Sequence, residues 1–561
     1  MKNSLLLSIF LFTCFFIACH GQKEKVSITP KNFEPQIDTI FKEVNDPNIP
    51  GVAVAVLQNG EMIFQKAYGS AHLEKGTPLS ESSVFTLASV SKQFTVLAIM
   101  LLADQKQLSL DDDIRKYIPE LPDYGHTVTL RHLASNSSGM RSDLQLLGMT
   151  GITPDDLITA EMVQQITFQQ KELNFPPETE FSYSNSGFVL LAEVVARISG
   201  QKFSTFMEQQ IFQPLGMHHT FVMDDAEKVV DNLAPSYAFY NNAYHEDIMR
   251  YSFFGSTGVF TTVNDFGKWA RNFSDPKVGN QQIFKAMNTP FVLNNGQQSI
   301  YGLGQFIEDY KGLSQIQHGG GSASYRTYIG RFPEQGLTVL VLSNNGTINS
   351  QSKALAVADL FLQPYFEQTT AEPKAEFIQL PTADLAAFSG SYLHAKNYYV
   401  RTIAVHKDTL IYTRPEQGNR ASPLFPITPT QFQLGEWEDT QVQFKQEKDV
   451  QTMHILIDGK EVDVLAQFTP KTYTSKALQA FIGTYYSEEL QTTYTLKLNK
   501  GILSVEHPKL GNIHLNPIQL DAFLGTSWQF NFLQFERNAA NEIEGFRLSS
   551  DRAKNILFSK V

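Results

Sequence analysis

The sequence predicts an α+β protein in which an antiparallel sheet flanked by helices is followed by two small antiparallel β-barrels. Three observations support this prediction. A pair of strands near the N-terminus leads into an apolar helix, a glycine-rich run precedes two further strands, and short strands recur at a nearly constant spacing in the C-terminal third. Strands interleaved with helices and then followed by runs of short strands are typical of a mixed domain joined to all-β modules.

The first element is a hairpin. Residues 52–57 form an apolar run that predicts a buried strand, and residues 62–68 predict its partner. Asn59-Gly60 lies between them, and this dipeptide is the strongest signal for a two-residue hairpin turn. An apolar stripe over residues 89–102 then predicts a buried helix.

This helix begins with a serine and a lysine three residues apart. Ser89 and Lys92 would share one helical face, because positions i and i+3 lie one turn apart. At the N-terminus, Ser89 would meet unpaired backbone N–H groups that favour an oxyanion, and a neutral, desolvated Lys92 can accept the serine proton. The alternative is an ordinary surface serine and lysine at the start of a helix.

A second pair of polar residues precedes the apolar helix predicted over residues 188–198. Tyr183 and Asn185 are two residues apart on a polar loop, so their side chains can converge on one site. A lysine ammonium beside Tyr183 would favour the phenolate, which could act as a base and then as an acid. Asn185 would bind a substrate carbonyl or hold the lysine. The alternative is a polar helix start with a capping residue.

A third candidate is His318, which is followed by three glycines, Gly319 to Gly321. Glycines let a substrate approach the backbone closely. Two alternatives are a bare glycine turn and a phosphate loop, but no Gly-Lys-Ser/Thr follows and no helix opens there. Strands are predicted over residues 325–332 and 337–342.

Other polar clusters favour structural roles. Asp111 to Asp113 have poor metal-ligand spacing, and a helix cap or solvated turn explains them better. His132 favours a packed or capping role over a catalytic one. We predict no metal and no cofactor. The C-terminal histidines lack ligand spacing and are expected on solvated strands: His394, His406, His454, His507 and His514.

Length and composition set the broad class. A chain of 561 residues predicts two to four domains, and its net charge of −12 argues against nucleic acid as a partner. The only two cysteines are Cys14 and Cys19, so the mature fold has no internal disulfide and no cysteine nucleophile or cysteine-ligated metal.

Residues 1–21 predict a targeting segment. Lys2 supplies its positive end, and the apolar run of residues 5–17 is too short and too early for a membrane span. We therefore expect export, with a periplasmic, outer-membrane-attached or secreted product. Residues 16–19 are similar to a lipobox, which favours membrane attachment through a lipidated Cys19; the alternative is cleavage after Gly21 and a soluble protein.

Three motifs now occur in one order: Ser89-x-x-Lys92, Tyr183-x-Asn185 and His318-x-Gly320. In order and spacing they resemble the motifs of class C β-lactamases and of the related penicillin-binding-protein-like serine hydrolases, the peptidase S12 type. The resemblance covers roughly residues 33–365 and predicts a catalytic domain over 30–366. Supporting blocks also match: Pro214-Leu215-Gly216-Met217, residues 258–269 and Tyr301-Gly302-Leu303-Gly304.

The resemblance implies an acyl-enzyme mechanism. Ser89 would attack a carbonyl while Lys92 and Tyr183 move the proton, and water would then release the acyl group. The backbone N–H groups of Ser89 and Gly321 would form the oxyanion hole. Asn185, His318 and Gly320 are the remaining substrate-binding candidates.

One departure concerns His318. Many β-lactamases and D,D-carboxypeptidases carry a lysine there, which helps to bind a substrate carboxylate. Histidine is mostly neutral at neutral pH, so this preference should weaken. Histidine at this position resembles the D-aminopeptidases and some esterases of the family.

The C-terminal third contains a repeat that follows a predicted linker, residues 367–384. Leu385, Phe388 and Tyr392 recur as Leu478, Phe481 and Tyr485, an offset of 478 − 385 = 93. Two modules, residues 385–470 and 476–561, are predicted. They resemble the lipocalin-like barrels of serine D-aminopeptidases. Barrels can bind apolar ligands, but we favour packing beside the catalytic cleft, where they would limit substrate size.

These inferences predict an exported serine hydrolase that cleaves an amide or ester through an acyl-enzyme on Ser89. A peptidase for D-amino-acid-containing peptides is the leading hypothesis, with an esterase or a β-lactamase as alternatives. A non-catalytic lipoprotein that uses the pocket as a sensor is the competing class. The partner is therefore a small molecule or a peptide, and the sequence does not define the oligomeric state.

Overall fold

The structure is a computed structural model that describes most of the chain. The predicted targeting segment lies outside the described residues, and so do residues 367–376 of the predicted linker. A search of the described helices for one long and apolar enough to cross a bilayer finds none. The described ranges are 33–153, 155–225, 227–366, 377–415, 419–435, 440–457 and 459–561.

The catalytic domain is built on an antiparallel sheet with the strand order β12-β13-β14-β15-β1-β2. This order brings the N-terminal hairpin next to the last strand of the domain, since β1 pairs with β15 along its whole length. The strands are β1 (Val52–Gln58), β2 (Glu61–Tyr68), β12 (Phe306–Tyr310), β13 (Leu313–Ser322), β14 (Tyr325–Phe332) and β15 (Leu337–Ser343).

The predicted hairpin turn is confirmed. Asn59 and Gly60 have φ values of 52° and 81°, and this pair of left-handed residues is what a type I′ turn requires. The predicted strands after the glycine run are also confirmed, because they coincide with β14 and β15.

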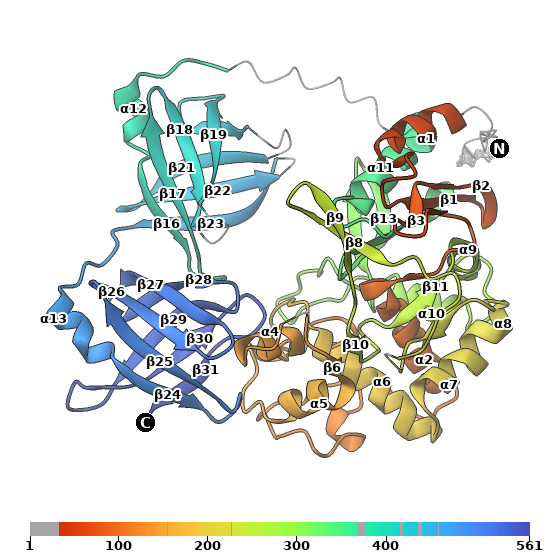
Figure 1. Ribbon diagram of the computed structural model, residues 1–561, viewed down its shortest axis with the longest axis horizontal. Coiled ribbons are helices and arrows are strands. Elements are labelled where there is room, and N and C mark those ends of the chain that lie inside the picture. The colour runs from red at the N-terminus through yellow and green to blue at the C-terminus, as the bar shows by residue number, and fades with distance from the viewer. Residues whose placement is uncertain are drawn as a thin grey trace, which may run out of the picture.

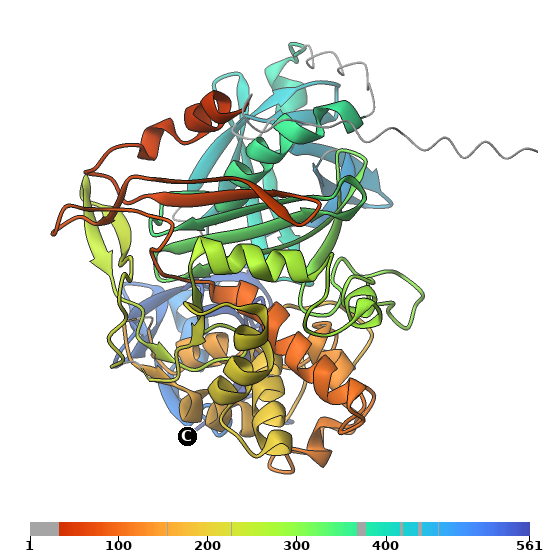
Figure 2. The ribbon, with the colours of Figure 1, turned by 90° about the vertical axis from the view of Figure 1, so that its right-hand side faces the viewer.

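Helices cover both faces of the sheet, as Figure 2 shows. Successive residues of β1 point to opposite faces, so Val54 packs with helices α1 (Glu34–Ile40) and α11 (Ser350–Leu362), whereas Ala55 packs with α2 (Ser91–Asp104) and α9 (Val263–Asn272). Both residues are fully buried. This double coverage explains why residues 52–57 of the strand are all apolar.

The remaining helices form a helical region under the second face of the sheet (Figures 1 and 2). They are α3 (Leu130–Ala134), α4 (Asp143–Met149), α5 (Ala160–Phe168), α6 (Asn185–Ser199), α7 (Phe203–Met207), α8 (Gln213–Leu215) and α10 (Gln281–Met287). Short strands link these helices. Three pairs are β3 (Ser70–His72) with β4 (Thr77–Pro78), β6 (Ile158–Thr159) with β10 (Tyr251–Ser252), and β8 (Ser236–Tyr240) with β9 (Ala243–Asp247). A three-stranded sheet has β11 (Val259–Thr261) in the middle, between β5 (Phe85–Thr86) and β7 (Phe221–Val222).

Two closed antiparallel barrels follow, each preceded by a short helix, α12 (Thr382–Ala386) or α13 (Ser475–Leu478). The first barrel contains β16 (Gly390–His394), β17 (Tyr399–His406), β18 (Thr409–Arg414), β19 (Arg420–Pro426), β20 (Gln431–Leu434), β21 (Thr440–Glu447), β22 (Val450–Ile457) and β23 (Lys460–Phe468). The second contains β24 (Gly483–Ser487), β25 (Thr492–Asn499), β26 (Ile502–His507), β27 (Gly511–Gln519), β28 (Ala522–Ser527), β29 (Phe530–Arg537), β30 (Ile543–Ser549) and β31 (Ile556–Lys560).

The repeat residues have equivalent roles in the two barrels. The hydroxyl of Tyr392 donates a hydrogen bond to the carbonyl of Phe388 at 2.7 Å, and the hydroxyl of Tyr485 donates to the carbonyl of Phe481 at 2.8 Å. Both tyrosines are fully buried. Aromatic side chains fill the interiors, such as the cluster around Phe444 in the first barrel, so the described barrel interiors are packed cores.

The second barrel packs against the helical region. Leu146 and Met149 of α4 and Ile166 of α5 belong to the same buried cluster as Tyr485 and Phe530 of the barrel. Figure 1 shows this barrel beside α4, with the first barrel standing above it. The second barrel therefore shares one buried cluster with the α4 and α5 side of the predicted catalytic domain.

Candidate active site

The candidate nucleophile lies on a turn between β5 and α2. Ser89 is the middle residue of the 3₁₀ turn Ala88–Val90, and α2 begins directly after this turn, at Ser91. The preceding Ala88 has a φ of 46°, a left-handed conformation that costs an L-residue about 1–2 kcal/mol. The packing of the turn must compensate for this cost, which is a common condition at functional sites.

Strands β13 and β14 both pack against this turn. Thr327 of the neighbouring β14 donates its Oγ1 hydrogen to the Leu87 carbonyl at 2.9 Å. A Cβ added to Gly320 would lie 2.2 Å from Thr327 Oγ1 and 2.3 Å from the Leu87 oxygen, so only glycine allows this contact. A Cβ added to Gly321 would come no closer than 3.8 Å to a neighbour. The glycines were predicted to give a substrate access to the backbone. At Gly320 the structure adds a second reason for glycine, because a larger residue would collide with Thr327 and Leu87.

Lys92 is held by two acceptors. Its Nζ donates to Asn185 Oδ1 and to the Ser256 carbonyl, both at 2.8 Å. The side chain is fully buried, and burial lowers the pKa of Lys92 well below its usual value. A neutral amine has two hydrogens and one lone pair. Since both hydrogens have acceptors, the lone pair is left to accept a proton.

Tyr183 lies beside this lysine. The centre of its ring is 4.8 Å from Lys92 Nζ, and the ring stacks on Phe306 with an interplanar angle of 3°. Burial raises the pKa of Tyr183 well above its usual value, and its hydrogen bond with the Ser89 side chain opposes this rise. The expectation of an easily formed phenolate is therefore wrong. Burial raises the pKa of the tyrosine, and burial also lowers the pKa of Lys92, so the ammonium that was expected to favour the phenolate is lost.

His318 is a neutral residue that supports Tyr183. Its Nδ1 is 2.7 Å from the Gly319 carbonyl and therefore carries the hydrogen, while Nε2 is 3.1 Å from the Tyr301 hydroxyl and accepts from it. Burial lowers the pKa of His318 to about 3. The ring is 1% exposed and lies 6.1 Å from the Tyr183 ring, centre to centre. The prediction of a neutral histidine is confirmed.

A cavity of about 500 Å³ opens at the nucleophile. Ser89, Asn185 and Gly321 line it, and so do apolar side chains such as Met249 and Phe253. Three of the seven predicted site residues therefore line this cavity. Lys92 and Tyr183 contact two of them, Asn185 and Ser89, whereas Gly320 and His318 are not part of the lining. Such a cavity can hold a small amide or ester with an apolar side chain.

Sequence reasoning missed Asp143 at the start of α4. Its side chain is fully buried, and burial raises the pKa of this carboxyl to about 6. Its Oδ1 accepts from the Leu144 N–H at 2.8 Å, whereas Oδ2 has no partner among the described residues. The carboxylate acts on Lys92 through space and raises the pKa of that amine. No motif marks an aspartate of this kind.

The structural roles predicted for two other clusters are confirmed. His132 completes a capping box with Thr129 at the start of α3, and its Nε2 lies 2.8 Å from Glu178. Asp113 caps a 3₁₀ turn by accepting from the Arg115 N–H. A search of the described residues for groups of metal-ligating side chains gives none.

The fold and the site define a class of hydrolases in which a serine lies on a turn before a helix and a buried lysine lies in the first turn of that helix, next to an antiparallel sheet. The chain belongs to the beta-lactamase family, whose family model matches residues 37–362.

The individual relatives have low sequence identity to this chain but align with long parts of it. A D-aminopeptidase of Gluconobacter oxydans (strain 621H) is 25% identical over 327 residues, which span 58% of this chain and 62% of the relative, less than two thirds of its length. A D-aminopeptidase of Brucella anthropi is 23% identical over 529 residues, or 91% of this chain and 95% of the relative. An octameric penicillin-binding protein homologue from Pyrococcus abyssi shares the fold, with a TM-score of 0.56 and 22% identity over 78% of this chain and 100% of that chain.

Proposed function

We propose that this protein is a serine hydrolase that forms an acyl-enzyme on Ser89 and acts on peptides containing a D-amino acid. One observation carries the proposal: a buried Lys92 whose two hydrogens are bound by Asn185 and Ser256, beside a tyrosine that is hydrogen-bonded to Ser89. This arrangement leaves a free base next to a hydroxyl at the wall of a cavity.

The proposed reaction has two steps. Ser89 Oγ attacks the substrate carbonyl, and the hydroxyl proton passes by way of Tyr183 to the neutral Lys92 amine. The new ammonium keeps its contacts with Asn185 and Ser256 and returns the proton to the leaving nitrogen or oxygen. Water, deprotonated by the same pair, then cleaves the ester and restores Ser89.

The substrate class rests on the relatives. Two relatives are named D-aminopeptidases, and one of them aligns with 91% of this chain. The neutral His318 agrees with this choice, since no cation occupies the position where many β-lactamases carry a lysine. An esterase has the same requirements at Ser89 and Lys92 and is the second candidate.

Labelling by a fluorophosphonate tests the nucleophile. Mass spectrometry should detect one adduct per chain on the wild type and none on Ser89→Ala. Ser274→Ala is the matched control, because Ser274 is exposed on another face of the domain, and it should label fully. An adduct that persists in Ser89→Ala, or no adduct on the wild type, would overturn the assignment.

Paired substrates test the specificity. The rate of hydrolysis of D-alanyl p-nitroanilide should exceed that of the L-isomer by at least tenfold, and Ser89→Ala should lose both activities by more than 10³-fold. Equal rates would contradict the D-amino-acid assignment. Hydrolysis of p-nitrophenyl esters without amide hydrolysis would favour the esterase.

Export is a separate proposal that rests on the predicted targeting segment, residues 1–21. Cell fractionation of the full chain and of Cys19→Ser, with a radiolabelled fatty acid, tests it. We expect label and membrane association to depend on Cys19, whereas a cytoplasmic, unprocessed chain would refute export.

A further inference from the structure

A turn of the second barrel reaches the candidate active site. Residues 550–555 connect β30 to β31 and form a tight turn, in which the Ser550 N–H donates to the Ala553 carbonyl at 2.8 Å. The carbonyl of Arg552 accepts from the Ser142 N–H at 2.9 Å and from Asn174 Nδ2 at 3.0 Å. These two donors belong to the catalytic domain, so the backbone of the turn is fixed against it.

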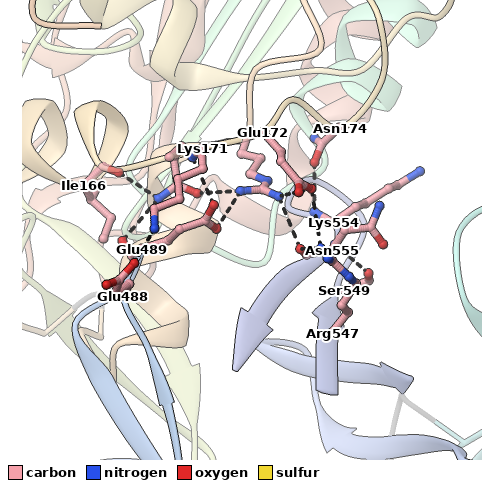
Figure 3. A network of polar contacts seen from close by, with 12 residues as sticks. Ile166, Lys171, Glu172, Asn174, Glu488, Glu489, Arg547, Ser549, Lys554 and Asn555 are labelled. Carbon is pink, nitrogen blue, oxygen red and sulfur yellow. Dashed lines mark hydrogen bonds and ion pairs between the residues drawn. The ribbon is translucent and has the colours of Figure 1, made fainter. Parts of the chain in front are cut away.

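A buried polar network supports the turn from below (Figure 3). Asn174 also accepts from the Lys554 N–H at 2.8 Å. Arg141, which has no exposed side-chain surface, binds Glu489 of the barrel at 2.8 Å and donates to the Asn555 carbonyl at 3.4 Å. The Glu489 carboxylate also accepts from the Lys171 N–H at 3.0 Å. The turn is therefore preorganised rather than free to move away.

This turn places a guanidinium at the reacting groups. The Arg552 guanidinium carbon lies 5.1 Å from the centre of the Tyr183 ring, and its charge lowers the pKa of Lys92. The side chain remains 43% exposed. Its ion pair is with Asp551 at 3.5 Å, and no hydrogen bond from its terminal nitrogens to the described residues is present. The planar donor fork is thus available to a ligand.

The position over Tyr183 indicates which part of a substrate would meet this fork. The group that takes the proton of the serine later gives it to the leaving nitrogen, so Tyr183 and Lys92 face the leaving-group side of the scissile bond. In a leaving group of one amino acid, the carboxyl carbon is about 2.5 Å from that nitrogen. A guanidinium binds a carboxylate through two parallel hydrogen bonds.

We propose that Arg552, supplied by the second barrel, binds the free carboxylate of a leaving group that consists of a single amino acid. The preferred substrate would then be a short peptide cleaved at its last peptide bond, an inference that rests on the proposed function. It gives the site a carboxylate-binding cation from a different domain, in place of the neutral His318.

Two peptides that differ only in charge test the proposal. D-alanyl-D-alanine carries the carboxylate, and D-alanyl-D-alaninamide lacks it. We expect a wild-type kcat/KM at least tenfold higher for the free acid. When each protein is compared on the pH plateau of its kcat/KM profile, Arg552→Ala should remove this preference through KM and leave the amide within twofold, while Arg552→Lys should retain part of the preference. Arg271→Ala, an exposed arginine on α9 paired with Asp275, is the matched control and should change neither substrate.

The outcomes separate specificity from general damage. The backbone carbonyl, not the side chain, anchors the turn, so Arg552→Ala should melt within about 2 °C of the wild type. An equal loss on both peptides, or a wild type without preference, would overturn the proposal.

A binding experiment keeps the test independent of turnover. If Ser89 takes up the fluorophosphonate but neither peptide is cleaved, the proposed peptidase function fails on its own. Titration calorimetry of Ser89→Ala with both peptides then decides on Arg552. At least tenfold tighter binding of the free acid, lost in the double variant with Arg552→Ala, would support the proposal, and equal affinities would refute it.

Discussion

Arg141 Nη1 of the catalytic domain and Glu489 Oε2 of the second barrel lie 2.8 Å apart, and the two side chains are 0% and 7% exposed. The pair joins the two domains at the point where the turn of residues 550–555 meets α4. Removal of one partner of a buried ion pair leaves an uncompensated charge, so this contact should control the interface.

Glu489→Gln tests this. We expect a loss of about 3 kcal/mol in the free energy of unfolding, because the buried Arg141 would keep only Glu172, a more distant carboxylate at 3.7 Å that is 52% exposed. Urea denaturation followed by circular dichroism measures it. Glu488→Gln is the matched control. Glu488 is next to Glu489 in the sequence, but its side chain is 74% exposed and pairs with Lys171 at the surface, so this variant should unfold like the wild type. Equal stability of all three proteins would contradict the structural role of the pair.

Asp143 should control the pH dependence of activity. Its carboxylate raises the pKa of Lys92, whereas Arg552 lowers it. The proposed mechanism requires the neutral amine, so kcat/KM should rise with pH through the pKa of Lys92. Asp143→Asn should therefore move the acid limb of the profile to lower pH, and Arg552→Ala should move it to higher pH. Shifts of the same sign in the two variants would show that Lys92 is not the titrating base.

The same aspartate should affect stability with a defined sign. Burial raises its pKa to about 6 from 3.8, so the folded state favours the protonated acid. Its contribution to stability is fully present below pH 4 and is lost as the pH rises through 6. A shift of about two pKa units corresponds to roughly 3 kcal/mol. Asp143→Asn should thus gain stability relative to the wild type between pH 4 and pH 7, and a constant difference would refute this.

Two adjacent glycines should respond differently to alanine. Gly320→Ala places a Cβ 2.2–2.3 Å from Thr327 Oγ1 and the Leu87 carbonyl, which forces β13 away from the nucleophile turn. We expect about 1–3 kcal/mol of destabilisation and a strong loss of fluorophosphonate labelling. Gly321→Ala has room for its Cβ and should melt near the wild type. Similar melting temperatures for both variants would contradict the packing argument.

Local signals in the sequence predicted much of the fold. Asn59-Gly60 predicted the hairpin because both residues readily adopt the left-handed backbone conformation that a two-residue turn between twisted strands requires. Tyr392 and Tyr485 revealed two equivalent modules, since a buried tyrosine that binds a carbonyl four residues earlier is needed in each. Ser89, Lys92 and Asn185 were predicted from the spacing within their motifs, and the structure places Lys92 Nζ 2.8 Å from Asn185 Oδ1.

The residues that were missed depend on contacts between distant segments. Arg552 lies in an ordinary polar turn, and nothing in that turn tells which domain it touches. The pairing of Arg141 with Glu489 likewise follows from the docking of α4 on the barrel. An easily formed phenolate at Tyr183 was wrongly expected, because the burial that raises the pKa of this tyrosine depends on contacts with Phe306 and Tyr301.

The two barrels share a core plan but differ in several connections, and the connection before the last strand differs most in length. In the first, β22 ends at Ile457 and β23 begins at Lys460, whereas in the second β30 ends at Ser549 and β31 begins at Ile556. The extra residues form the turn that carries Arg552. The same turn also contributes Ala553, which is fully buried, to the core of the second barrel. A deletion that removed the turn would therefore remove part of the barrel core together with Arg552, so this contact with the candidate active site is tied to the integrity of the barrel.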